Sequence, residues 1–541
     1  MSDIAARVAA FDLDRELAIL GDVFGPLNAA VICCDRHSQD GERLALRYRD
    51  ARGGTAYWTF AALRDESVRL ASLLQSIGVR KGDRVAGLLP RTPALLITVL
   101  AVWRLGAVYQ PLFTAFGPKA IEYRLVEANT KVVVTNGANR SKIEGPTGIA
   151  IVNTEPSPGD FDFWSASGSA VAVEPAQCGL DDPFLIMFTS GTTGAPKPLL
   201  VPIKAIAAFV GYMRDGIGLE ASDRFWNVAD PGWAYGLYYA IVGPLALGIA
   251  TTFYDGPFTA ASTYETVEAF DINNLAGAPT AYRLLMGEGA AAASAVKGRL
   301  RAVSSAGEPL NPEIIRWFDA HLAAPIFDHY GQTELGMVLC NHHGIGHPVH
   351  VGAAGFASPG HRLAILSDEQ VELGVGVPGM LALDRSQSPL AWFAGYHGRE
   401  TSAFVGKWYL TGDTCEINED GSISFVGRSD DVITTSGYRV GPFDVESALI
   451  EHEAVLESAV IGKPDPNRTE IIKAFVVLGE GHASSDALAA ELQAHVKARL
   501  SAHAFPREIE FVAALPKTPS GKVQRFLLRN QEMAAQAERA G

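Results

Sequence analysis

The residues from 184 to 200 constrain this chain most, because an apolar run there ends abruptly in a series of small polar residues. Residues 184–188 are all apolar and predict a buried strand. Residues 189–194 then read Thr-Ser-Gly-Thr-Thr-Gly, and Lys197 follows. Small residues let backbone N–H groups approach an anion closely, the hydroxyls add donors, and the lysine adds a positive charge. The pattern predicts a loop that grips phosphate groups.

The spacing within this loop differs from that of the Walker loop, which has a glycine, four residues and then Gly-Lys-Ser/Thr. Here Gly191 and Gly194 are three positions apart, and Pro198 follows Lys197. The plain alternative is a surface loop after a strand, because loops rich in Ser, Thr and Gly are common.

Upstream of this loop, predicted strands and helices alternate. Thr59 can cap a helix that Gly78 ends, and residues 93–105 form a second helix. The strand candidates are residues 84–89, 107–112 and 131–135. Strands that alternate with helices predict an α/β fold with a parallel, helix-covered sheet.

Length and composition set the broad class. A chain of 541 residues exceeds one ordinary core, so two or more domains are expected. The net charge of −15 argues against a general nucleic-acid binder. Five scattered cysteines without zinc spacing indicate a reducing compartment. The acidic N-terminus does not resemble a leader and the apolar run 94–103 is too short to span a bilayer, so we expect a cytoplasmic protein without an integral membrane segment.

Further stretches combine turn residues with aromatic, acidic or basic side chains. They lie at residues 227–236, 274–283, 304–310, 328–336, 408–413, 427–441 and 515–525. Each has a plain interpretation when taken alone: an aromatic side chain in a core, an acid in a turn, or a solvated lysine. After residue 442 the sequence predicts helices at 444–451 and 485–500 and strands at 456–461 and 472–478.

Taken together, these motifs resemble those of the adenylate-forming superfamily in both order and spacing. The order Thr-Ser-Gly-Thr-Thr-Gly-x-Pro-Lys, Gly-Glu-Pro, Tyr-Gly-x-Thr-Glu, Thr-Gly-Asp and a late Gly-Lys is similar to that of acyl-CoA synthetases of the short- to medium-chain type. The resemblance implies a large N-terminal adenylate-forming domain (1–429) with helix-covered sheets, and a small mobile α+β C-terminal domain (430–541) that turns about Asp430.

The resemblance also implies roles for individual residues. The expected phosphate loop comprises Thr189, Ser190, Gly191, Thr192, Thr193, Gly194 and Lys197. The expected adenine and ribose contacts are Gly307, Glu308, Pro309, Tyr330, Asp413 and Arg428, with Asp328, His329, Gly331 and Gln332 in the same motif. Thr333 and Arg439 are expected at the phosphates, Ser436 and Gly437 at the thiol tunnel, and Thr189 and Glu334 at Mg²⁺. Lys522, Thr333 and Lys197 are the expected catalytic residues, whereas His329 receives no catalytic role.

The implied reaction has two halves and uses ATP, Mg²⁺ and coenzyme A. A carboxylic acid attacks the α-phosphorus of MgATP and gives an acyl-adenylate and pyrophosphate, after which the thiol of coenzyme A displaces AMP. The protein must neutralise the phosphates and align the carboxylate, which Lys197 and Lys522 can do. The small domain then swings so that Lys522 leaves the site.

The pocket for the acid is expected to be lined by Trp233, Ala234, Tyr235, Ala306 and Gly331. Synthetases restricted to acetate typically carry tryptophan at the position of Gly331. We therefore expect a larger acid: short branched, medium-chain or aryl. Acetate or propionate remains an alternative, because one methylene in an apolar pocket is worth only roughly 1–3 kcal/mol.

Three functions besides acyl-CoA synthesis are also compatible with these motifs: an enzyme that loads a carrier-protein thiol, a luciferase-type oxygenase, and a non-catalytic ATP-binding relative. The last is disfavoured because Lys522, Glu334 and Asp413 are all present. Pro516 stands six residues before Lys522, in a pattern that resembles sites used by protein acetyltransferases. A lysine acetyltransferase is therefore a candidate partner at Lys522, where acetylation would remove the charge.

Overall fold

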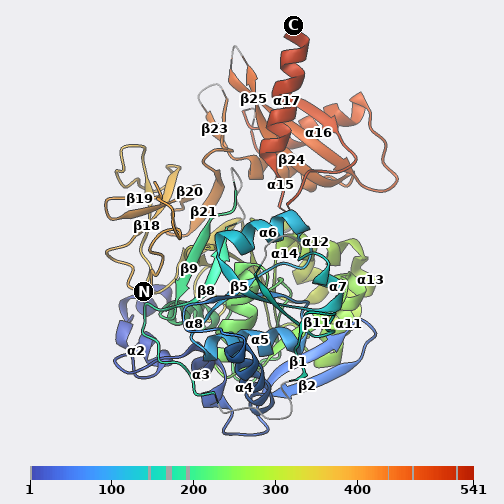
Figure 1. Cartoon of the computed structure of the whole chain (residues 1–541). Coiled ribbons are helices and arrows are strands. Elements are labelled where there is room, and N and C mark those ends of the chain that lie inside the picture. The colour runs from blue at the N-terminus through green and yellow to red at the C-terminus, as the bar shows by residue number, and fades with distance from the viewer. Residues whose placement is uncertain are drawn as a thin grey trace.

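The structure, a computed structural model, has a large part and a smaller part that sits at one end of it (Figure 1). It describes residues 3–143, 148–165, 173–189, 195–435, 438–465, 468–501, 503–518 and 522–540. Among these residues, each strand up to β21 (Ile423–Arg428) pairs within the large part, and each strand from β22 (Ile433–Thr435) onward pairs within the small part. The α/β fold with a large N-terminal and a small C-terminal domain is therefore confirmed.

The first sheet of the large domain is mainly parallel, as predicted, in the order β7-β6-β5-β3-β4-β8-β9. Its strands are β3 (Arg84–Leu88), β4 (Val108–Pro111), β5 (Thr130–Thr135), β6 (Ala150–Asn153), β7 (Phe161–Asp162), β8 (Pro183–Phe188) and β9 (Pro198–Pro202). Strands β8 and β9 are antiparallel and flank the predicted phosphate loop. Helix α5 (Pro93–Arg104) is buried along nearly its whole length and packs on β3 and β4.

The ends of helix α4 (Phe60–Ser76) follow from local chemistry. The hydroxyl of Thr59 accepts a hydrogen bond from the backbone N–H of Ala62 at 3.2 Å and so caps the first turn. Gly78, just past the helix, has a φ of +96°, which glycine adopts without the Cβ penalty of other residues. The helix predicted from Thr59 to Gly78 is therefore confirmed.

The second sheet changes from parallel to antiparallel, in the order β10-β12-β13-β14-β15-β16-β21-β20-β18-β17. Its parallel strands are β10 (Phe225–Asn227), β12 (Asn274–Gly277), β13 (Ala302–Ala306) and β14 (Ile326–Gln332). Its antiparallel strands are β15 (Gly336–Cys340), β16 (Ala353–Ala357), β17 (Leu363–Leu366), β18 (Gly379–Asp384), β20 (Trp408–Ile417) and β21, with β19 (Phe404–Val405) paired to β20. The predicted nucleotide motifs lie at the ends of β13 and β14 and in the middle of β20.

A third, smaller sheet and the remaining helices complete the large domain. The sheet has the order β11-β1-β2, with β1 (Leu44–Asp50), β2 (Thr55–Thr59) and β11 (Thr251–Asp255). The longer connecting helices are α6 (Pro118–Glu127), α8 (Ala205–Asp215), α11 (Ala260–Phe270), α12 (Pro279–Gly287) and α14 (Pro312–Trp317). A short helix α9 (Ala234–Gly236) continues into a π-helical turn, η4 (Leu237–Val242), and then into α10 (Gly243–Ala246).

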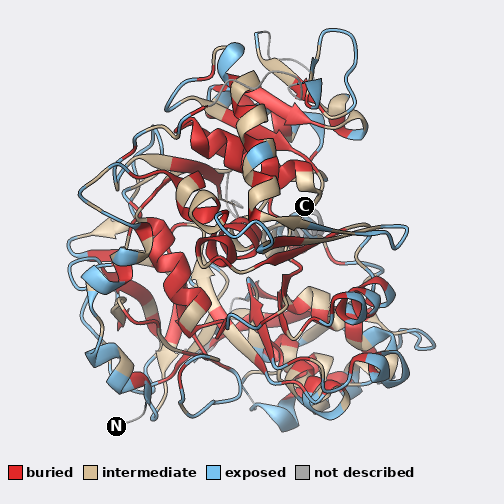
Figure 2. Cartoon of the chain, turned by 90° about the horizontal axis from the view of Figure 1, so that it is seen from below, coloured by how far each residue is buried: buried red, intermediate tan, exposed pale blue. Residues whose placement is uncertain are grey.

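The small domain has its own sheet and its own buried core. The sheet has the order β23-β22-β25-β24 with β26 beside β25, and its further strands are β23 (Tyr438–Val440), β24 (Val455–Asp465), β25 (Thr469–Leu478) and β26 (Glu508–Phe511). Its helices are α15 (Pro442–Ile450), α16 (Asp486–Arg499) and α17 (Arg525–Ala540). Figure 2 shows a buried interior in each domain. The predicted helices and strands of this domain are confirmed, and α17 is an addition.

None of the described helices combines the length and the apolar character that crossing a bilayer requires.

Candidate active site

The base of the predicted phosphate loop is closed by two hydrogen bonds. The backbone N–H of Thr189 donates to the carbonyl of Lys197 at 3.0 Å, and the N–H of Lys197 donates to Oγ1 of Thr189 at 3.2 Å. The ammonium of Lys197 lies 4.9 Å from the centre of the Tyr396 ring, within cation–π range. The predicted loop residues Ser190, Gly191, Thr192, Thr193 and Gly194 lie outside the described residues. These two bonds therefore hold Lys197 next to Thr189 at the end of β8.

Asp413, in the middle of β20, is the centre of a buried polar network with residues at the ends of β14 and β21. Its Oδ2 accepts hydrogen bonds from the Tyr330 hydroxyl at 2.5 Å and from Nε2 of Gln332 at 2.9 Å. Its Oδ1 accepts one from Arg428 at 3.2 Å, directly across the β20–β21 ladder. Burial raises the pKa of Asp413, and the charge of Arg428 opposes that rise. A carboxylate has about four acceptor sites, so the group, with three hydrogen bonds already made, can still receive one hydroxyl of a sugar.

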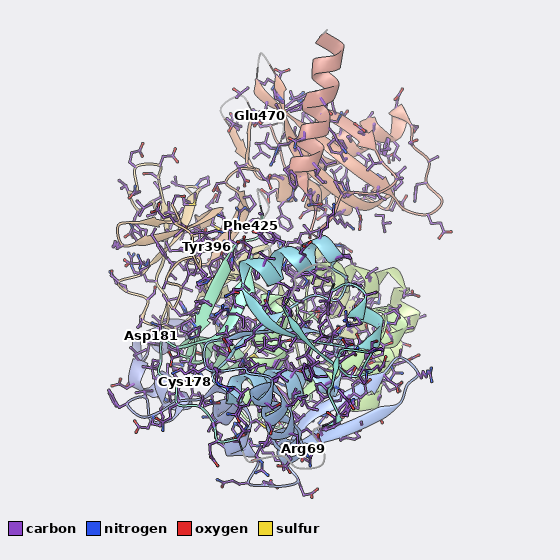
Figure 3. All side chains as sticks on the ribbon, in the orientation of Figure 1. Arg69, Cys178, Asp181, Tyr396, Phe425 and Glu470 are labelled. Carbon is purple, nitrogen blue, oxygen red and sulfur yellow. The ribbon has the colours of Figure 1, made fainter. Side chains whose placement is uncertain are left out.

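Glu334, two residues after β14, is the second buried carboxylate of the site and is 8% exposed. Its Oε1 accepts a hydrogen bond from the hydroxyl of Tyr396 at 2.7 Å. Burial raises the pKa of Glu334, while this bond and the charge of Lys197 oppose the rise. Tyr396 therefore joins the phosphate-loop lysine to Glu334. Figure 3 shows Tyr396 at the end of the large domain that faces the small domain.

Glu334 is suited to share a magnesium ion with nucleotide phosphates. Among the described residues, no group of three or more His, Cys, Asp or Glu side chains could hold a metal ion. Mg²⁺ commonly takes one or two protein oxygens and completes its shell with phosphates and water. The Glu334 carboxylate and the Thr189 hydroxyl are oxygen donors of that kind. The donor set therefore fits magnesium that arrives with ATP.

The Gly-Glu-Pro turn after β13 is anchored by its glutamate. Oε2 of Glu308 accepts hydrogen bonds from the Thr280 hydroxyl at 3.0 Å and from Arg283 at 3.2 Å, both on α12. Gly307 has a φ of +98°, which the sharp turn into Glu308 and Pro309 requires. The turn thus follows β13, and β13 pairs with β14, the strand that carries Tyr330.

Asp328, on β14, is a carboxylate beside a cavity. Its Oδ2 accepts from the backbone N–H of Leu310 at 3.1 Å, whereas its Oδ1 is buried and has no hydrogen-bond partner among the described residues. Burial raises the pKa of Asp328 to about 7. The cavity that Asp328 lines has a volume of about 240 Å³. An unpartnered buried oxygen beside a cavity marks a place where a bound polar group would be stabilised.

Lys522 lies in the small domain and is partly buried. Its backbone N–H donates to Oγ1 of Thr518 at 3.1 Å. The charge of Lys522 acts to lower the pKa of Asp413, after the stronger effects of Arg428, Tyr330 and Gln332. The two residues, which the sequence connects only through the family resemblance, therefore interact electrostatically across the two domains. Asp430, the expected hinge, is exposed between β21 and β22, and its Oδ1 lies 3.5 Å from Nε of Arg428.

Of four further predicted residues, two are described and two are not. Thr333 is partly exposed next to Glu334, and its carbonyl accepts from the Tyr238 hydroxyl at 3.1 Å. The backbone of Arg439 lies in β23, where it pairs with Thr434. Ser436 and Gly437 lie outside the described residues.

The predicted pocket residues Trp233, Ala234 and Tyr235 lie at the start of α9 and are partly exposed, whereas the following helix is buried. The Trp233 ring packs against Phe113 and Phe116 at centroid distances of 5.8 and 5.5 Å. The hydroxyl of Tyr235 lies 3.2 Å from that of Tyr212. The Tyr212 hydroxyl also lies 2.7 Å from Nδ1 of His329, on β14. Tyr235 is therefore linked to β14 through Tyr212, whereas Trp233 packs among the phenylalanines.

The other two pocket residues have a structural role that the sequence does not show. Ala306 has no exposed surface, and it pairs with His329 between β13 and β14. At Gly331, an added Cβ would lie 2.1 Å from the carbonyl oxygen of Gly336 and 2.8 Å from Cα of Met337. The β14–β15 turn therefore requires glycine at residue 331, a reason for this residue that the sequence alone does not give. His329 is buried and bonded on both ring nitrogens, consistent with the absence of a catalytic role.

Two family models and a characterised relative match this chain. The family model described as AMP-binding enzyme matches residues 35–396, and that of the AMP-binding enzyme C-terminal domain matches residues 444–522. The acetyl-coenzyme A synthetase of Bacillus subtilis is 38% identical over 532 residues, which cover 94% of this chain and 91% of that protein.

Solved structures of similar proteins also match this chain over nearly its whole length. An acyl-CoA synthetase from Brucella canis is 54% identical, with a TM-score of 0.79 and coverage of 99% of this chain and 100% of that one. An anthranilate CoA ligase in complex with anthranoyl-AMP is 28% identical, with a TM-score of 0.84 and coverage of 95% and 98%. Because the matches span both domains and the nucleotide motifs between them, the chain belongs to the AMP-binding enzyme family as an adenylate-forming acyl-CoA synthetase, which uses ATP, Mg²⁺ and coenzyme A.

Proposed function

We propose that this synthetase activates a carboxylic acid larger than acetate, and that an aryl, medium-chain or short branched acid is its substrate. The observation that carries the proposed site is the buried carboxylate of Asp413, held from β14 and β21 and within reach of the charge of Lys522. A carboxylate fixed in this way suits a ribose, and a mobile cation beside it suits the phosphate to which the acid becomes joined.

We assign the adenylation chemistry to charges from both domains. Lys197 and Lys522 neutralise the phosphates and the attacking carboxylate, which otherwise repel each other. Glu334 and Thr189 hold the magnesium ion, whose charge further offsets the triphosphate. Tyr330 and the 307–309 turn hold the adenine, and Thr333 donates to the α-phosphate. After pyrophosphate leaves, we propose that the domain beginning at residue 430 turns about Asp430, so that Lys522 withdraws and the thiol enters.

The preference for a larger acid rests on the residues at the start of α9. Ala234 is small, Tyr235 is partly exposed, and the β14–β15 turn excludes any side chain at residue 331. Aromatic rings such as that of Tyr235 favour flat or apolar acyl groups. The relatives named for acetate and for anthranilate are compatible with one fold that serves acids of different size.

Pyrophosphate exchange tests this proposal directly. Purified enzyme is assayed for ATP–pyrophosphate exchange with acetate, propionate, butyrate, isobutyrate, hexanoate and benzoate, and then for AMP release with and without coenzyme A. We expect a larger acid to exceed acetate in kcat/KM by about 10-fold or more, the worth of one or two methylenes. If acetate gives the highest kcat/KM, the assignment of the pocket is wrong. AMP release that ignores coenzyme A but responds to a carrier protein would favour the carrier-loading alternative.

We also propose Lys522 as a site of regulation by a lysine acetyltransferase. Lys522 is only partly buried, and its loop contains Pro516 six residues earlier. Acetylation removes the charge, so adenylation should fall on the order of 100-fold while supplied acyl-adenylate is still converted to thioester. Lys522→Ala should reproduce this pattern. Lys517→Ala is the matched control, because Lys517 lies on the same loop and pairs with Glu457. Full ATP-dependent activity in Lys522→Ala would contradict both the regulation and the catalytic role.

A further inference from the structure

A row of three hydrogen-bonding side chains leads from the core to the proposed acid pocket. Nε2 of His329 lies 2.9 Å from the carbonyl oxygen of Asn341. Nδ1 of His329 lies 2.7 Å from the hydroxyl of Tyr212, and that hydroxyl lies 3.2 Å from the hydroxyl of Tyr235. His329 and Tyr212 are each 2% exposed, whereas Tyr235 is partly exposed at the start of α9. The row therefore runs from a buried inner end to Tyr235, a residue predicted to line the acid pocket.

The carbonyl of Asn341 sets the position of every proton in this row. A carbonyl oxygen only accepts, so Nε2 of His329 must carry a hydrogen. Burial lowers the pKa of His329 well below its ordinary value, so the ring is neutral and Nδ1 carries a lone pair. The Tyr212 hydroxyl must then donate its one hydrogen to Nδ1.

The same reasoning fixes the hydroxyl of Tyr235. Because Tyr212 has given its hydrogen to His329, its oxygen can only accept, and Tyr235 must donate to it. Burial raises the pKa of both phenols, so neither loses its proton near neutral pH. Tyr239, which packs 5.5 Å from the Tyr235 ring, has its hydroxyl engaged by the backbone N–H of Met337 at 2.8 Å. With residue 235 in the proposed acid pocket, its oxygen would offer a bound acid lone pairs and no hydrogen.

We propose that Tyr235 selects acids whose acyl group carries a hydrogen-bond donor, a hydroxyl or an amino group, and that Tyr212 and His329 position it for that task. This inference rests on the proposed function, because it takes residue 235 as part of the acid pocket. An acid with a donor at the right depth bonds to the Tyr235 oxygen. An acceptor-only group such as a methoxy or keto oxygen meets a second set of lone pairs and leaves its own oxygen unpaired.

A site built around one polar partner discriminates more strongly than an apolar wall. A buried polar group left unpaired costs more than a missing methylene, and sites that bond a substrate hydroxyl reject analogues that lack it. We expect the preferred hydroxy acid to exceed its methyl and methoxy counterparts by about 10-fold or more in kcat/KM. The preference should not change with pH between 6 and 8, because His329 stays neutral throughout this range.

The test compares matched benzoic acids in the pyrophosphate-exchange assay. The panel contains benzoate and its hydroxy, amino, methyl and methoxy derivatives at each ring position. The full-length enzyme is compared with Tyr235→Phe and Tyr212→Phe. Tyr235→Phe should bring the ratio of hydroxy to methyl acids close to one. Tyr212→Phe removes the acceptor of the Tyr235 hydroxyl, which then turns toward the pocket and donates, so the methoxy acids should gain at least several-fold on the hydroxy acids.

A matched control removes a different buried tyrosine hydroxyl. Tyr264 donates to the carbonyl of Leu285, within the helical layer that α11 and α12 form. Tyr264→Phe should keep the hydroxyl preference of the wild-type enzyme. The inference is overturned if benzoate is activated but no hydroxy or amino acid is preferred, or if the preference persists in Tyr235→Phe. Absence of exchange with every acid, aliphatic acids included, would overturn the proposed function together with it.

The position of the His329 proton can be measured without turnover. In enzyme with ¹⁵N-labelled histidine, the signals that disappear in His329→Gln report this ring. We expect the neutral form with hydrogen on Nε2 from pH 6 to 8. A hydrogen on Nδ1, or a charged ring within this range, would reverse the proton order and overturn the inference.

Discussion

Replacement of Tyr396 by phenylalanine isolates one bond of the site. The change removes the hydroxyl that donates to Oε1 of Glu334 at 2.7 Å, and it keeps the ring that lies 4.9 Å from the ammonium of Lys197. Any effect should therefore arise from Glu334. Because Glu334 is buried, water cannot readily replace the lost hydroxyl, and the carboxylate is left without this hydrogen bond.

The size of the effect follows from the strength of that bond. A hydrogen bond to a charged group contributes about 1.5–3 kcal/mol, and one pKa unit corresponds to about 1.4 kcal/mol. Burial already raises the pKa of Glu334, and the Tyr396 hydroxyl lowers it. Its loss should therefore raise this pKa further.

The pH profile of the exchange reaction shows this shift. A protonated Glu334 cannot hold Mg²⁺, so activity declines as the pH falls through its pKa. In Tyr396→Phe the acidic limb of log kcat should move to higher pH, and the Mg²⁺ concentration for half-maximal rate should rise more at pH 6 than at pH 8. The folded-state pKa then lies further above its unfolded value, so the variant should also lose stability, relative to wild type, as the pH rises.

Two results would refute this reasoning. An unchanged acidic limb with an unchanged Mg²⁺ requirement would show that Tyr396 does not tune Glu334. An equal loss of rate at every pH would indicate a positioning effect on the loop instead. Tyr264→Phe serves as the reference, since it removes a buried hydroxyl outside the site.

Three further changes test different parts of the structure. Asp413→Asn removes the negative charge that pairs with Arg428. It should raise the KM for ATP about 10-fold or more, with a smaller effect on the KM for the acid. Equal changes in both KM values would contradict a ribose contact. Gly331→Ala places a methyl group against the Gly336 carbonyl and should lower the free energy of unfolding by about 1–3 kcal/mol in urea titrations; an unchanged midpoint would show that the turn adapts freely. Thr59→Ala removes the cap of α4 and should cost about 1 kcal/mol without altering kcat, and no loss of stability would contradict the capping role.

Local chemistry explains why part of the fold could be predicted. Helix α4 begins at a threonine cap and ends before a glycine with positive φ, so residues next to the helix determine both of its ends. Helix α16 is similar, since the Ser485 hydroxyl accepts from the backbone N–H of Leu488. Such signals act over three or four residues and do not depend on the rest of the chain.

The antiparallel half of the second sheet has no comparable signal. Strand β16 pairs with β21, which is distant in the sequence, and the register shifts between Ala353 and Gly355. Helix α17 begins with Arg525, whose guanidinium bonds to Glu446 on α15, so a tertiary ion pair marks its start. Both features depend on contacts between remote segments, which periodicity cannot report.

Some residues of the site could likewise be predicted, and others could not. The family resemblance supplied Lys197, Glu334 and Asp413; the structure places the first two just outside strands and Asp413 in the middle of β20. Tyr396 was missed, because its function as a link between Lys197 and Glu334 exists only in three dimensions. A lone tyrosine between glycine and histidine carries no motif, and only the partner contacts reveal it.

The way the small domain rests on the large one bears on the proposed swing. In this structure the charge of Lys522 acts on Asp413, as the proposed adenylation step would require. An ion pair that spans the two domains, Arg316 with Glu451 at 3.3 Å, has an arginine side chain that is 56% exposed. Exposed ion pairs of this kind contribute about 0–1 kcal/mol, so breaking this one costs little. Arg316 also keeps a second partner, Glu313, on its own helix at 2.7 Å, and is not left unpaired when the domains separate. An ion pair between the domains that breaks at little cost is compatible with the proposed swing of the small domain.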